Sequence, residues 1–544
     1  EYQTFKDMGI GVATPAGYKK IRCHFVYAIK HDGRHKSRLV AGGHLTDVPL
    51  ESVYSGVVSL RSLRLVIFLA ELNDLKLYGA DIGNAYLEAK TKEKVCIVAD
   101  SGFGPLEGHL LIIDKALYGL RTSGLRWHER FADTLRDMGF EPSRADGDVW
   151  MRQGKKPSGE LVYEYIAVYV DDLCIAAIDP DEILGQLKGK YKYKLKGDGP
   201  MTFHLGCNFE RDPDGTLTLG PIKYIEKMVD NYEHMYGEKP KPATSPLVKN
   251  DHPEIDETPL LGPEDVVRYQ SMIGAMQWAV TLGRFDICTA VMTMSRFRVA
   301  PREGHLDRLK RIYGYLLKFP KGAIRVRVEL PDYSDLVDVE YDWAYTVYGN
   351  VKEVELKDAP IPLGKSVITT TYVDANLYHD LITGRAVTGV LHLVNGTVVE
   401  WYSKRQATVE TATYGSEFVA ARIATDQVLD LRMTLRYFGV PLKTKSYMFG
   451  DNRSVVTSAT IPHSGLNKRH NALSYHRVRE AIASTALTFL HISGTANPAD
   501  ILSKHGAWAN MWPLLKPLLF WRGDTSIIGD GVATKTTKTK IKLD

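Results

Sequence analysis

Residues 166–177 read IAVYVDDLCIAA, an apolar run interrupted by two adjacent aspartates, Asp171 and Asp172. The β-branched and aromatic residues on both sides predict two strands joined by a tight turn, and aspartate is common in such turns. Two neighbouring carboxylates in an apolar segment repel each other and lose hydration on burial. A divalent cation would remove that repulsion. The stretch is therefore either an ordinary hairpin turn or part of a metal site.

The composition of the chain is that of an ordinary globular protein. Of its 544 residues, 44% are hydrophobic and 25% are charged, so extended disorder is not expected. A chain of this length exceeds a single core and predicts several domains. The net charge of +4 and the pI of about 8.5 permit a polyanionic partner without requiring one.

The cysteines and the apolar runs argue against a disulfide-rich, zinc-binding or membrane-spanning protein. The five cysteines are scattered without a CxxC pair, which argues against a disulfide framework or a zinc site and fits a reducing compartment. No apolar run reaches the length of a membrane span, and the N-terminus EYQTFKDMGI lacks the apolar core of a signal peptide. We therefore expect no membrane partner. Because the first residue is Glu1 rather than Met, we expect a processed product or a fragment.

The pattern along the chain predicts two mixed units with a helical region between them. Helices alternate with antiparallel hairpins up to about residue 210, and a mainly helical block covers about 265–319. Residues 320–366 show no regular pattern. From about 367, strands, an NG turn and helices alternate again, and the chain ends in the basic stretch KTTKTKIKLD.

A third aspartate joins the first two. The stretch LKLYGADIGNAYLEAK places Asp81 at the end of a predicted strand, which neighbours the Asp171–Asp172 hairpin if the α+β interpretation is correct. Joining nucleotides requires charge neutralisation at the attacking and leaving oxygens, and two divalent metal ions held by a few carboxylates supply it. These three aspartates could hold such ions.

Several segments of the chain resemble those of one known protein family. LYGADIGNAYLEA and YVDDL resemble the two catalytic motifs of reverse transcriptases. The segments HKSRLVAGGH, KALYGLRTSGLRWHERF, FHLGCNFERDPDGTLTLGPIKYIEKMV and YQSMIGAMQWAVTLGRFDICTAV resemble, in order, the polymerase of copia-type LTR retrotransposons. The resemblance covers roughly residues 15–320.

The resemblance implies a role for individual residues of the polymerase. Asp81, Asp171 and Asp172 would be catalytic metal ligands. Tyr86 would lie under the incoming sugar and favour deoxynucleotides, although a core aromatic is the alternative. The remaining substrate contacts would be Lys36 and Arg38 on the triphosphate, the backbone at Ile82 beside it, and Tyr118 and Gly119 near the templating base. For the two basic residues, a solvated strand face is the alternative.

Two further segments of the polymerase are notable. Residues 203–206 (FHLG) resemble the primer grip. Residues 122–124 read Thr-Ser-Gly where the family usually has Gln-Ala-Pro, and losing that proline is expected to loosen a turn near the template. The lysine–tyrosine stretch LKGKYKYKLKGDG at 187–199 is either a backbone contact for nucleic acid or a solvated face.

A second set of four acids lies in the C-terminal unit. Asp374 ends a strand, Glu417 lies on a helix, Asp451 ends another strand, and Asp500 lies in the first turn of a helix capped by Asn497. Each acid alone has an ordinary structural explanation. Their order on hairpin, helix, strand and helix resembles the RNase H fold, which implies two-metal cleavage of RNA in an RNA–DNA hybrid.

The nuclease unit also departs from its family. The first motif reads DANLYHD where Asp-Ala-Asp-Trp is common, and Ala472 stands where an aspartate is common. His470 and His476 are either substrate contacts or structural, and His491 is more simply a strand residue. No histidine is assigned as a proton shuttle.

The sequence therefore predicts an α+β multidomain protein: a right-hand polymerase (fingers, palm and thumb), a helical connection and a C-terminal RNase H-like α/β domain. The expected boundaries are 1–215 for fingers and palm, 216–262 for thumb and linker, 263–366 for the connection, 367–512 for the RNase H-like domain and 513–544 for the basic tail.

The expected function is RNA- and DNA-directed DNA synthesis with RNase H activity, using Mg²⁺ or Mn²⁺. The alternative is a catalytically silent nucleic-acid-binding or structural subunit, and an active polymerase with an impaired nuclease is a third option. The expected partners are an RNA template, a DNA primer, an RNA–DNA hybrid and dNTPs, with self-association or integrase association possible in principle. The family implies cytoplasmic virus-like particles, and the basic tail could serve nuclear entry.

Overall fold

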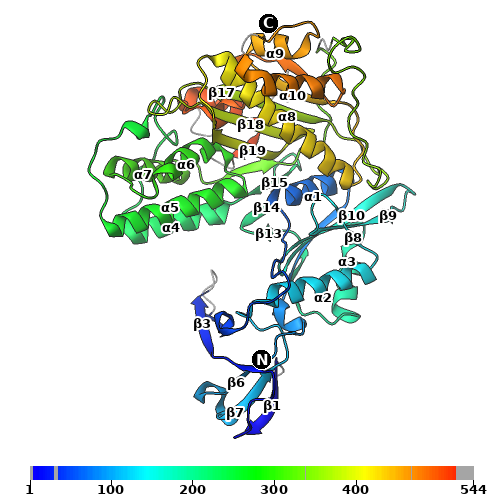
Figure 1. Cartoon of the computed structure of the whole chain (residues 1–544), viewed down its shortest axis with the longest axis vertical. Helices are drawn as coiled ribbons and strands as arrows, with labels where there is room; N and C mark the ends of the chain where they lie inside the picture. Colours follow the sequence, from blue (N-terminus) through cyan, green and yellow to red (C-terminus); the bar gives the residue numbers. More distant parts are fainter. Residues whose placement is uncertain (1–3, 30–34, 337–338, 467–468, 522–544) are drawn as a thin grey trace. The chain divides into compact units, whose positions relative to one another are not determined.

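The computed structural model describes residues 4–29, 35–336, 339–466 and 469–521. The chain forms two compact units (Figure 1). The first contains residues 1–66 and 75–201, and the second contains residues 67–74 and 202–544. Helix α1 (Leu60–Leu72) contributes residues to both. Each unit is described separately below.

A six-stranded antiparallel sheet forms the centre of the first unit, with strand order β12-β5-β11-β10-β9-β8. The strands are β5 (Lys76–Ile82), β8 (Glu141–Pro142), β9 (Val149–Lys155), β10 (Leu161–Tyr169), β11 (Asp172–Ala177) and β12 (Leu195–Pro200). Helices α2 (Ser123–Asp137) and α3 (Pro180–Gly189) bury their apolar sides in one core with this sheet (Figure 1). Gly139 follows α2 with φ of 82°, a left-handed backbone conformation in which the helix ends.

Two smaller groups of strands complete the first unit. A four-stranded sheet has the order β1-β7-β6-β2, and β3 pairs with β4 in a separate antiparallel hairpin. Their bounds are β1 (Phe5–Ile10), β2 (Lys19–Lys20), β3 (Cys23–Ile29), β4 (His35–Ala41), β6 (Val95–Val98) and β7 (His109–Ile113). Leu39 and Ala41 of β4 share a core with the four-stranded sheet, so the base of the hairpin is fixed.

The second unit begins with a five-stranded sheet and a group of helices. The sheet order is β13-β14-β15-β16-β22, from β13 (Phe203–His204), β14 (Cys207–Arg211), β15 (Leu217–Gly220), β16 (Gly322–Arg325) and β22 (Leu519–Trp521). The helices are α4 (Ile222–Tyr236), α5 (Pro263–Leu282), α6 (Cys288–Met294) and α7 (Glu303–Lys318). The helical block predicted for about 265–319 is therefore present, and β14 and β15 pair as a hairpin around the sequence DPDG.

A second five-stranded sheet, with order β19-β18-β17-β20-β21, carries the C-terminal acids. Its strands are β17 (Thr369–Asn376), β18 (Val387–Val394), β19 (Thr397–Arg405), β20 (Ser446–Gly450) and β21 (Leu487–His491). The first three are antiparallel, whereas β20 and β21 run parallel to β17. The expected hairpin with its turn at Asn395 is confirmed.

Helices cover both faces of this C-terminal sheet. On one face, α8 (Thr413–Tyr437), α9 (Arg453–Thr460) and α10 (Ala472–Ala483) share a core with β17, β18, β20 and β21 (Figure 1). The short helix α11 (Asp500–Ser503) packs on β17 and β18, and α6 packs on β19. This arrangement confirms the expected RNase H-like α/β class within an α+β multidomain chain.

The structure differs from two local expectations. The helix that carries Asp500 begins at Asp500 itself, although the Asn497 side chain still accepts a hydrogen bond from the Ala499 N–H at 3.1 Å. Of the predicted basic tail, residues 513–515 belong to α12 (Trp508–Leu515) and β22 pairs with β16, while 522–544 lie outside the described residues. The composition of the tail could not indicate this pairing, because β16 lies almost 200 residues earlier in the chain.

The sequence showed no regular pattern over 320–366, but the structure forms strand β16 at its start, at 322–325. The described residues of 326–366, called the connecting segment below, contain no helix or strand. Ion pairs and a cation–π contact connect this segment to helices α8 and α10. Glu353 accepts hydrogen bonds from both Arg432 and Arg436 of α8, and the Arg479 guanidinium of α10 lies 4.8 Å from the ring centroid of Trp343. No described helix of the chain is long and apolar enough to cross a membrane.

Candidate catalytic sites

The first carboxylate cluster begins at the turn between β10 and β11. Tyr169 pairs with Asp172, so Val170 and Asp171 form a two-residue loop. Val170 has φ of 60°, a backbone conformation that is unfavourable for a β-branched residue. The buried indole of Trp127 on α2 donates a 2.7 Å hydrogen bond to the Val170 carbonyl. The predicted hairpin is confirmed, and a helix behind it holds the turn in place.

The register of the sheet places the third aspartate beside the turn. β5 pairs antiparallel with β11 so that Asp81 lies directly opposite Asp172. The N–H of Ile82 also donates a 2.8 Å hydrogen bond to the Asp171 carbonyl. Asp81 and the Asp171–Asp172 pair, about ninety positions apart in the sequence, therefore meet at the ends of two neighbouring central strands, as the α+β interpretation predicted.

Burial and mutual repulsion disfavour full ionisation of this cluster. Desolvation, followed by the charges of Asp171 and Asp81, raises the pKa of Asp172 to about 6. The pKa of Asp171 is also raised, mainly by desolvation and then by Asp81, while Lys36 and Arg38 act in the opposite direction. A bound cation would offset the desolvation and the mutual repulsion and so favour the ionised carboxylates.

A cavity of about 300 Å³ opens beside these acids. Its lining combines Asp81 and Asp171 with Lys36, Tyr118 and Lys196. Lys196 lies opposite Asp81 in the register of β12 and β5, and its chain packs beside Gly83. The sequence identified the lysine–tyrosine stretch but not Lys196 itself, because only the register shows which lysine faces the acids.

Aromatic rings and an arginine lie next to the cavity. The rings of Tyr86 and Tyr118 are 5.0 Å apart between centroids, and the Arg38 guanidinium lies 5.6 Å from the centroid of Tyr118. Gly119 has φ of 89°, and a Cβ on it would lie 2.2 Å from the Ala41 carbonyl oxygen. The predicted substrate contacts are therefore close together, and Gly119 is also required for close backbone packing. Their assignments to sugar, triphosphate and template remain predictions.

The turn that lacks the family's proline is held by side-chain hydrogen bonds instead. The Ser123 hydroxyl donates to the Leu117 carbonyl at 2.6 Å, and the Thr122 hydroxyl donates to the Glu93 carboxylate at 2.7 Å. In the second unit, Leu205 and Gly206 adopt positive φ in the turn between β13 and β14, and His204 is buried there. Burial lowers the pKa of His204 to about 4.

The second carboxylate cluster lies at the C-terminal end of the parallel strands. Asp374 on β17, Glu417 on α8 and Asp451 directly after β20 bring one carboxylate oxygen each within 4.8 Å of one another. Among the described residues, no other trio of acidic, histidine or cysteine side chains is this compact, and the first cluster is more open. Carboxylate oxygens are the donors that Mg²⁺ and Mn²⁺ prefer, so the residues fit such an ion.

The fourth acid of this cluster is engaged differently. Asp500 receives the Lys504 ammonium at 2.7 Å, and the same ammonium lies 3.2 Å from Asp374. The Ser503 hydroxyl donates to the other Asp374 oxygen. Neither Ser503 nor Lys504 was predicted, since their role depends on α11 packing against β17 and β18.

Burial affects these acids more than those of the first cluster. Desolvation, then the charges of Asp374 and Asp451, raises the pKa of Glu417 well above its usual range. Desolvation and Asp374 raise the pKa of Asp451, and they raise that of Asp500 to about 6 although Lys504 opposes the change. A divalent ion would offset the burial and the mutual repulsion of these acids and so favour their ionised forms.

The three histidines of the sequence analysis have separate partners. His470 lies 3.0 Å from the buried Glu410, and His476 lies 2.7 Å from the Tyr348 hydroxyl of the connecting segment. His491 lies 3.1 Å from the Asp451 carbonyl, so it contacts the backbone of a candidate metal ligand. None of these contacts identifies a proton shuttle.

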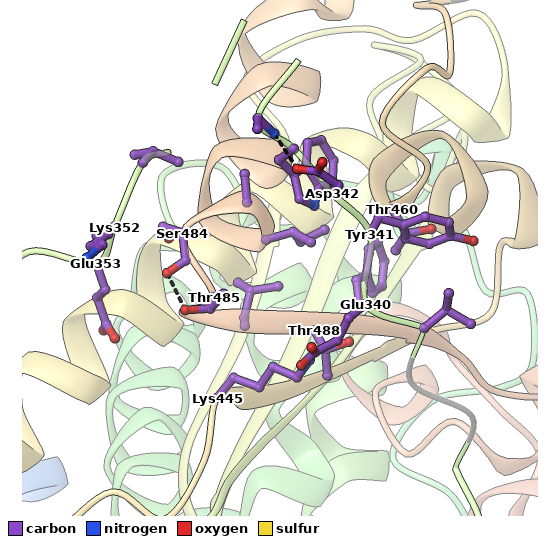
Figure 2. A pocket seen from close by; sticks show the side chains of 18 of the residues that line it. Glu340, Tyr341, Asp342, Lys352, Glu353, Lys445, Thr460, Ser484, Thr485 and Thr488 are labelled. Carbon is purple, nitrogen blue, oxygen red and sulfur yellow. Dashed lines mark hydrogen bonds and ion pairs between the residues drawn. The ribbon is translucent and has the colours of Figure 1, made fainter. Parts of the chain in front are cut away.

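A larger cavity of about 850 Å³ is lined by none of the acids of the two clusters. Figure 2 shows it between the connecting segment, with Glu340 and Tyr341, and the residues Ser484, Thr485 and Thr488 at β21. Its lining mixes hydroxyls, apolar side chains and opposite charges, and Lys445 lies 3.8 Å from Glu340. Among the described residues, the compact group of acids that could hold a metal ion, Asp374, Glu417 and Asp451, is not part of this lining.

The chain is similar to a known protein family and to several curated proteins. Residues 8–248 match the family described as reverse transcriptase (RNA-dependent DNA polymerase). The chain is 25% identical over 510 residues to the retrovirus-related Pol polyprotein from transposon TNT 1-94 of Nicotiana tabacum, an alignment that covers 91% of this chain and 35% of that protein. For the Pol polyprotein from transposon RE1 of Arabidopsis thaliana, the identity is 25% over 504 residues, covering 90% and 31%.

A shorter relative aligns over most of its own length. The putative transposon Ty5-1 protein of Saccharomyces cerevisiae is 25% identical over 351 residues, covering 63% of this chain and 97% of that protein. By contrast, the chain spans about a third of the length of the two Pol polyproteins.

Among solved structures, a foamy viral protease-reverse transcriptase in complex with double-stranded DNA aligns with a TM-score of 0.47 and 12% identity. The alignment covers 90% of this chain and 67% of that one. A structure of the foamy viral protein with an RNA/DNA hybrid gives a TM-score of 0.30 and 12% identity, covering 87% and 71%.

Proposed function

Because residues 8–248 belong to the reverse transcriptase family and the whole chain is a relative of copia-type Pol polyproteins, we propose that the chain is a bifunctional enzyme. Its first unit copies RNA or DNA into DNA, and its second unit cleaves the RNA strand of an RNA–DNA hybrid. The observation that carries the proposal is the meeting of Asp81 with the Asp171–Asp172 turn, together with the separate compact trio Asp374, Glu417 and Asp451.

In the polymerase site, Asp81, Asp171 and Asp172 would hold Mg²⁺ or Mn²⁺. When bound, such ions stabilise charge on the attacking and leaving oxygens of phosphoryl transfer. Lys36 and Lys196 line the cavity beside the acids and Arg38 lies next to Tyr118, and these three side chains would bind the triphosphate. Tyr86 packs on Tyr118 and would close the sugar end of that cavity against a 2′-hydroxyl.

In the nuclease site, Asp374, Glu417 and Asp451 would hold the metal ion that activates water for cleavage of the RNA strand. Asp374 is fully buried, which fixes its position and excludes bulk water from one side of the site. Asp500 completes the acidic rim beside Lys504. The proposed partners are the RNA template, the DNA primer, the hybrid and dNTPs, with the duplex bound mainly through its phosphates.

The proposal is tested by extension of a DNA primer on a labelled RNA template with dNTPs and Mg²⁺. Asp171→Asn is expected to abolish extension and to preserve RNA cleavage of a preformed hybrid. Glu417→Gln is expected to do the reverse, because the two clusters are separate. Asp133→Asn and Glu480→Gln remove acids outside both clusters and serve as matched controls.

The outcomes separate the proposal from its rivals. Folded wild type that binds the hybrid but neither extends nor cleaves under Mg²⁺ or Mn²⁺ would identify a silent binding subunit and overturn the proposal. Extension without loss of RNA would show an active polymerase with an impaired nuclease, which the altered DANLYHD motif makes a specific concern.

A further inference from the structure

Lys504 occupies a central position in the nuclease cluster. Its ammonium lies 2.7 Å from one oxygen of Asp500 and 3.2 Å from one oxygen of Asp374. The Lys504 side chain is 37% exposed, whereas Asp374 is fully buried. A single cation of the protein itself thus bridges two of the four acids.

The backbone holds Lys504 at this place. Its N–H donates to the Asp500 carbonyl at 3.0 Å at the end of α11. α11 is packed so closely on β18 that a Cβ at Gly389 would lie 2.7 Å from the Ala499 carbonyl oxygen and 2.9 Å from the carbonyl carbon of Leu502. The lysine therefore projects from a fixed helix end and not from a surface loop.

Asp374 is shared between the two sides of the cluster. One oxygen of its carboxylate groups with Glu417 and Asp451 in the arrangement that fits a divalent ion. The same carboxylate also has partners at the end of α11: the Lys504 ammonium contacts one of its oxygens, and the Ser503 hydroxyl donates to the other. Asp500 is not part of the compact trio.

We propose that Lys504 is an internal counter-cation that makes the two sides of the cluster unequal toward divalent ions. The first ion binds at Asp374, Glu417 and Asp451, and the Lys504 ammonium directly contacts one of these three acids, Asp374. A second ion on the Asp374–Asp500 side must compete with the ammonium, and it binds more weakly. This inference rests on the proposed nuclease site, and Lys504 acts in it as a positioning residue.

The proposal is tested by calorimetric titration of the full chain with MnCl₂ and with MgCl₂. The double variant Asp171→Asn/Asp172→Asn is the background, so that the polymerase cluster contributes little to the heat. In this background we expect one ion to bind clearly more tightly than the second. Adding Lys504→Met should tighten the weaker step by about tenfold or more, because an adjacent positive charge is removed from a poorly solvated site.

The matched control is Lys365→Met, which removes a lysine with the same 2.7 Å ammonium–carboxylate distance to Asp74 on an exposed surface. It should leave both binding steps unchanged. In EDTA, Lys504→Met should also lower the thermal unfolding midpoint, since two acids lose their counter-charge, and added Mn²⁺ should restore it. A purely structural lysine would lower the midpoint without tightening metal binding.

The result that overturns the proposal is a Lys504→Met variant whose metal affinities stay within about twofold of the background. If that variant does not fold, Lys504→Gln gives the same comparison with a shorter neutral side chain. Hybrid cleavage by the wild type combined with unchanged metal affinities would overturn this inference alone. Tightened metal binding in a chain that never cleaves would support the inference and count against the proposed function.

Discussion

The Trp127 indole provides the most direct test of how the first unit holds its aspartates. Trp127 is 2% exposed, and its N–H donates to the carbonyl of Val170, the residue with positive φ in the turn before Asp171. A β-branched residue in this conformation costs about 1–2 kcal/mol, so the turn depends on support from outside. Trp127→Phe removes that support and keeps an aromatic ring.

The expected loss has two parts. Losing the hydrogen bond and leaving the Val170 carbonyl unpaired costs about 1–2 kcal/mol. Replacing a buried indole with the smaller phenyl ring costs about 1–2 kcal/mol more through lost burial and a small cavity. Because a chain of two units need not unfold in one step, the change is measured as a shift of the thermal midpoint.

The control is Trp150→Phe. Trp150 is also 2% exposed and lies in the same core, but its indole is not bonded to the turn. It should therefore lose only the packing contribution. Extension should fall by about tenfold or more in Trp127→Phe, since a small displacement of catalytic groups is costly, and stay within about twofold in Trp150→Phe.

Hybrid cleavage should be unchanged in both variants, because neither tryptophan belongs to the second unit. If Trp127→Phe extends primers as well as Trp150→Phe while both lose stability, the indole only fills space. The inference that it positions the Asp171–Asp172 turn would then be wrong.

Three further predictions address other parts of the first unit. Gly119→Ala should be destabilising by several kcal/mol because its Cβ would meet the Ala41 carbonyl, whereas Gly159→Ala, at a similar φ of 91° with no atom within 4 Å, should cost only about 1 kcal/mol in thermal unfolding. Asp172→Asn should abolish extension yet raise the thermal midpoint of the metal-free protein above pH 6. The folded carboxyl keeps its proton up to about pH 6 whereas the unfolded one loses it near pH 3.8, so this group destabilises the fold as the pH rises through that window; an unchanged midpoint at pH 8 would contradict this. Arg38→Ala should raise KM for dNTPs by about tenfold in steady-state extension and leave hybrid cleavage unaffected, and equal losses in both activities would point to misfolding instead.

Much of the fold could be predicted because local signals agreed with the final structure. Alternating apolar residues around Asp171 and Asp172 specify a hairpin, and Gly139 ends a helix wherever that helix packs. The seven acids stand in a turn, at or near strand ends, or in the first two turns of a helix, and metal chemistry restricts the residue type at such a site. Sequence reasoning could therefore name the acids of both clusters before their distances were known.

The residues that the sequence did not reveal act through partners far away in the chain. In the sequence, Trp127 is an ordinary apolar residue of an amphipathic helix. Only the structure shows that its indole donates a hydrogen bond to the Val170 carbonyl, 43 positions later. Lys504 contacts Asp374 across 130 positions, and lysine is common on any surface. No local pattern marks such a residue, because its role is set by the packing of one element on another.

Both clusters bring several carboxylates close together, and the two differ in where the neighbouring lysines lie. This difference fits the proposed substrates of the two sites. In the first, the acids remain partly exposed beside a cavity, and Lys36 and Lys196 line that cavity where a polyphosphate would need positive charge. In the second, Asp374 is fully buried and the neighbouring cation, Lys504, is bonded to the acids themselves. A site that must admit and release a highly charged nucleotide needs cations directed at the ligand. A site that cleaves one phosphodiester of a bound duplex instead needs its acids held rigidly. The Lys504 ammonium holds Asp374 and Asp500 through direct contacts, and this requires no bound nucleic acid.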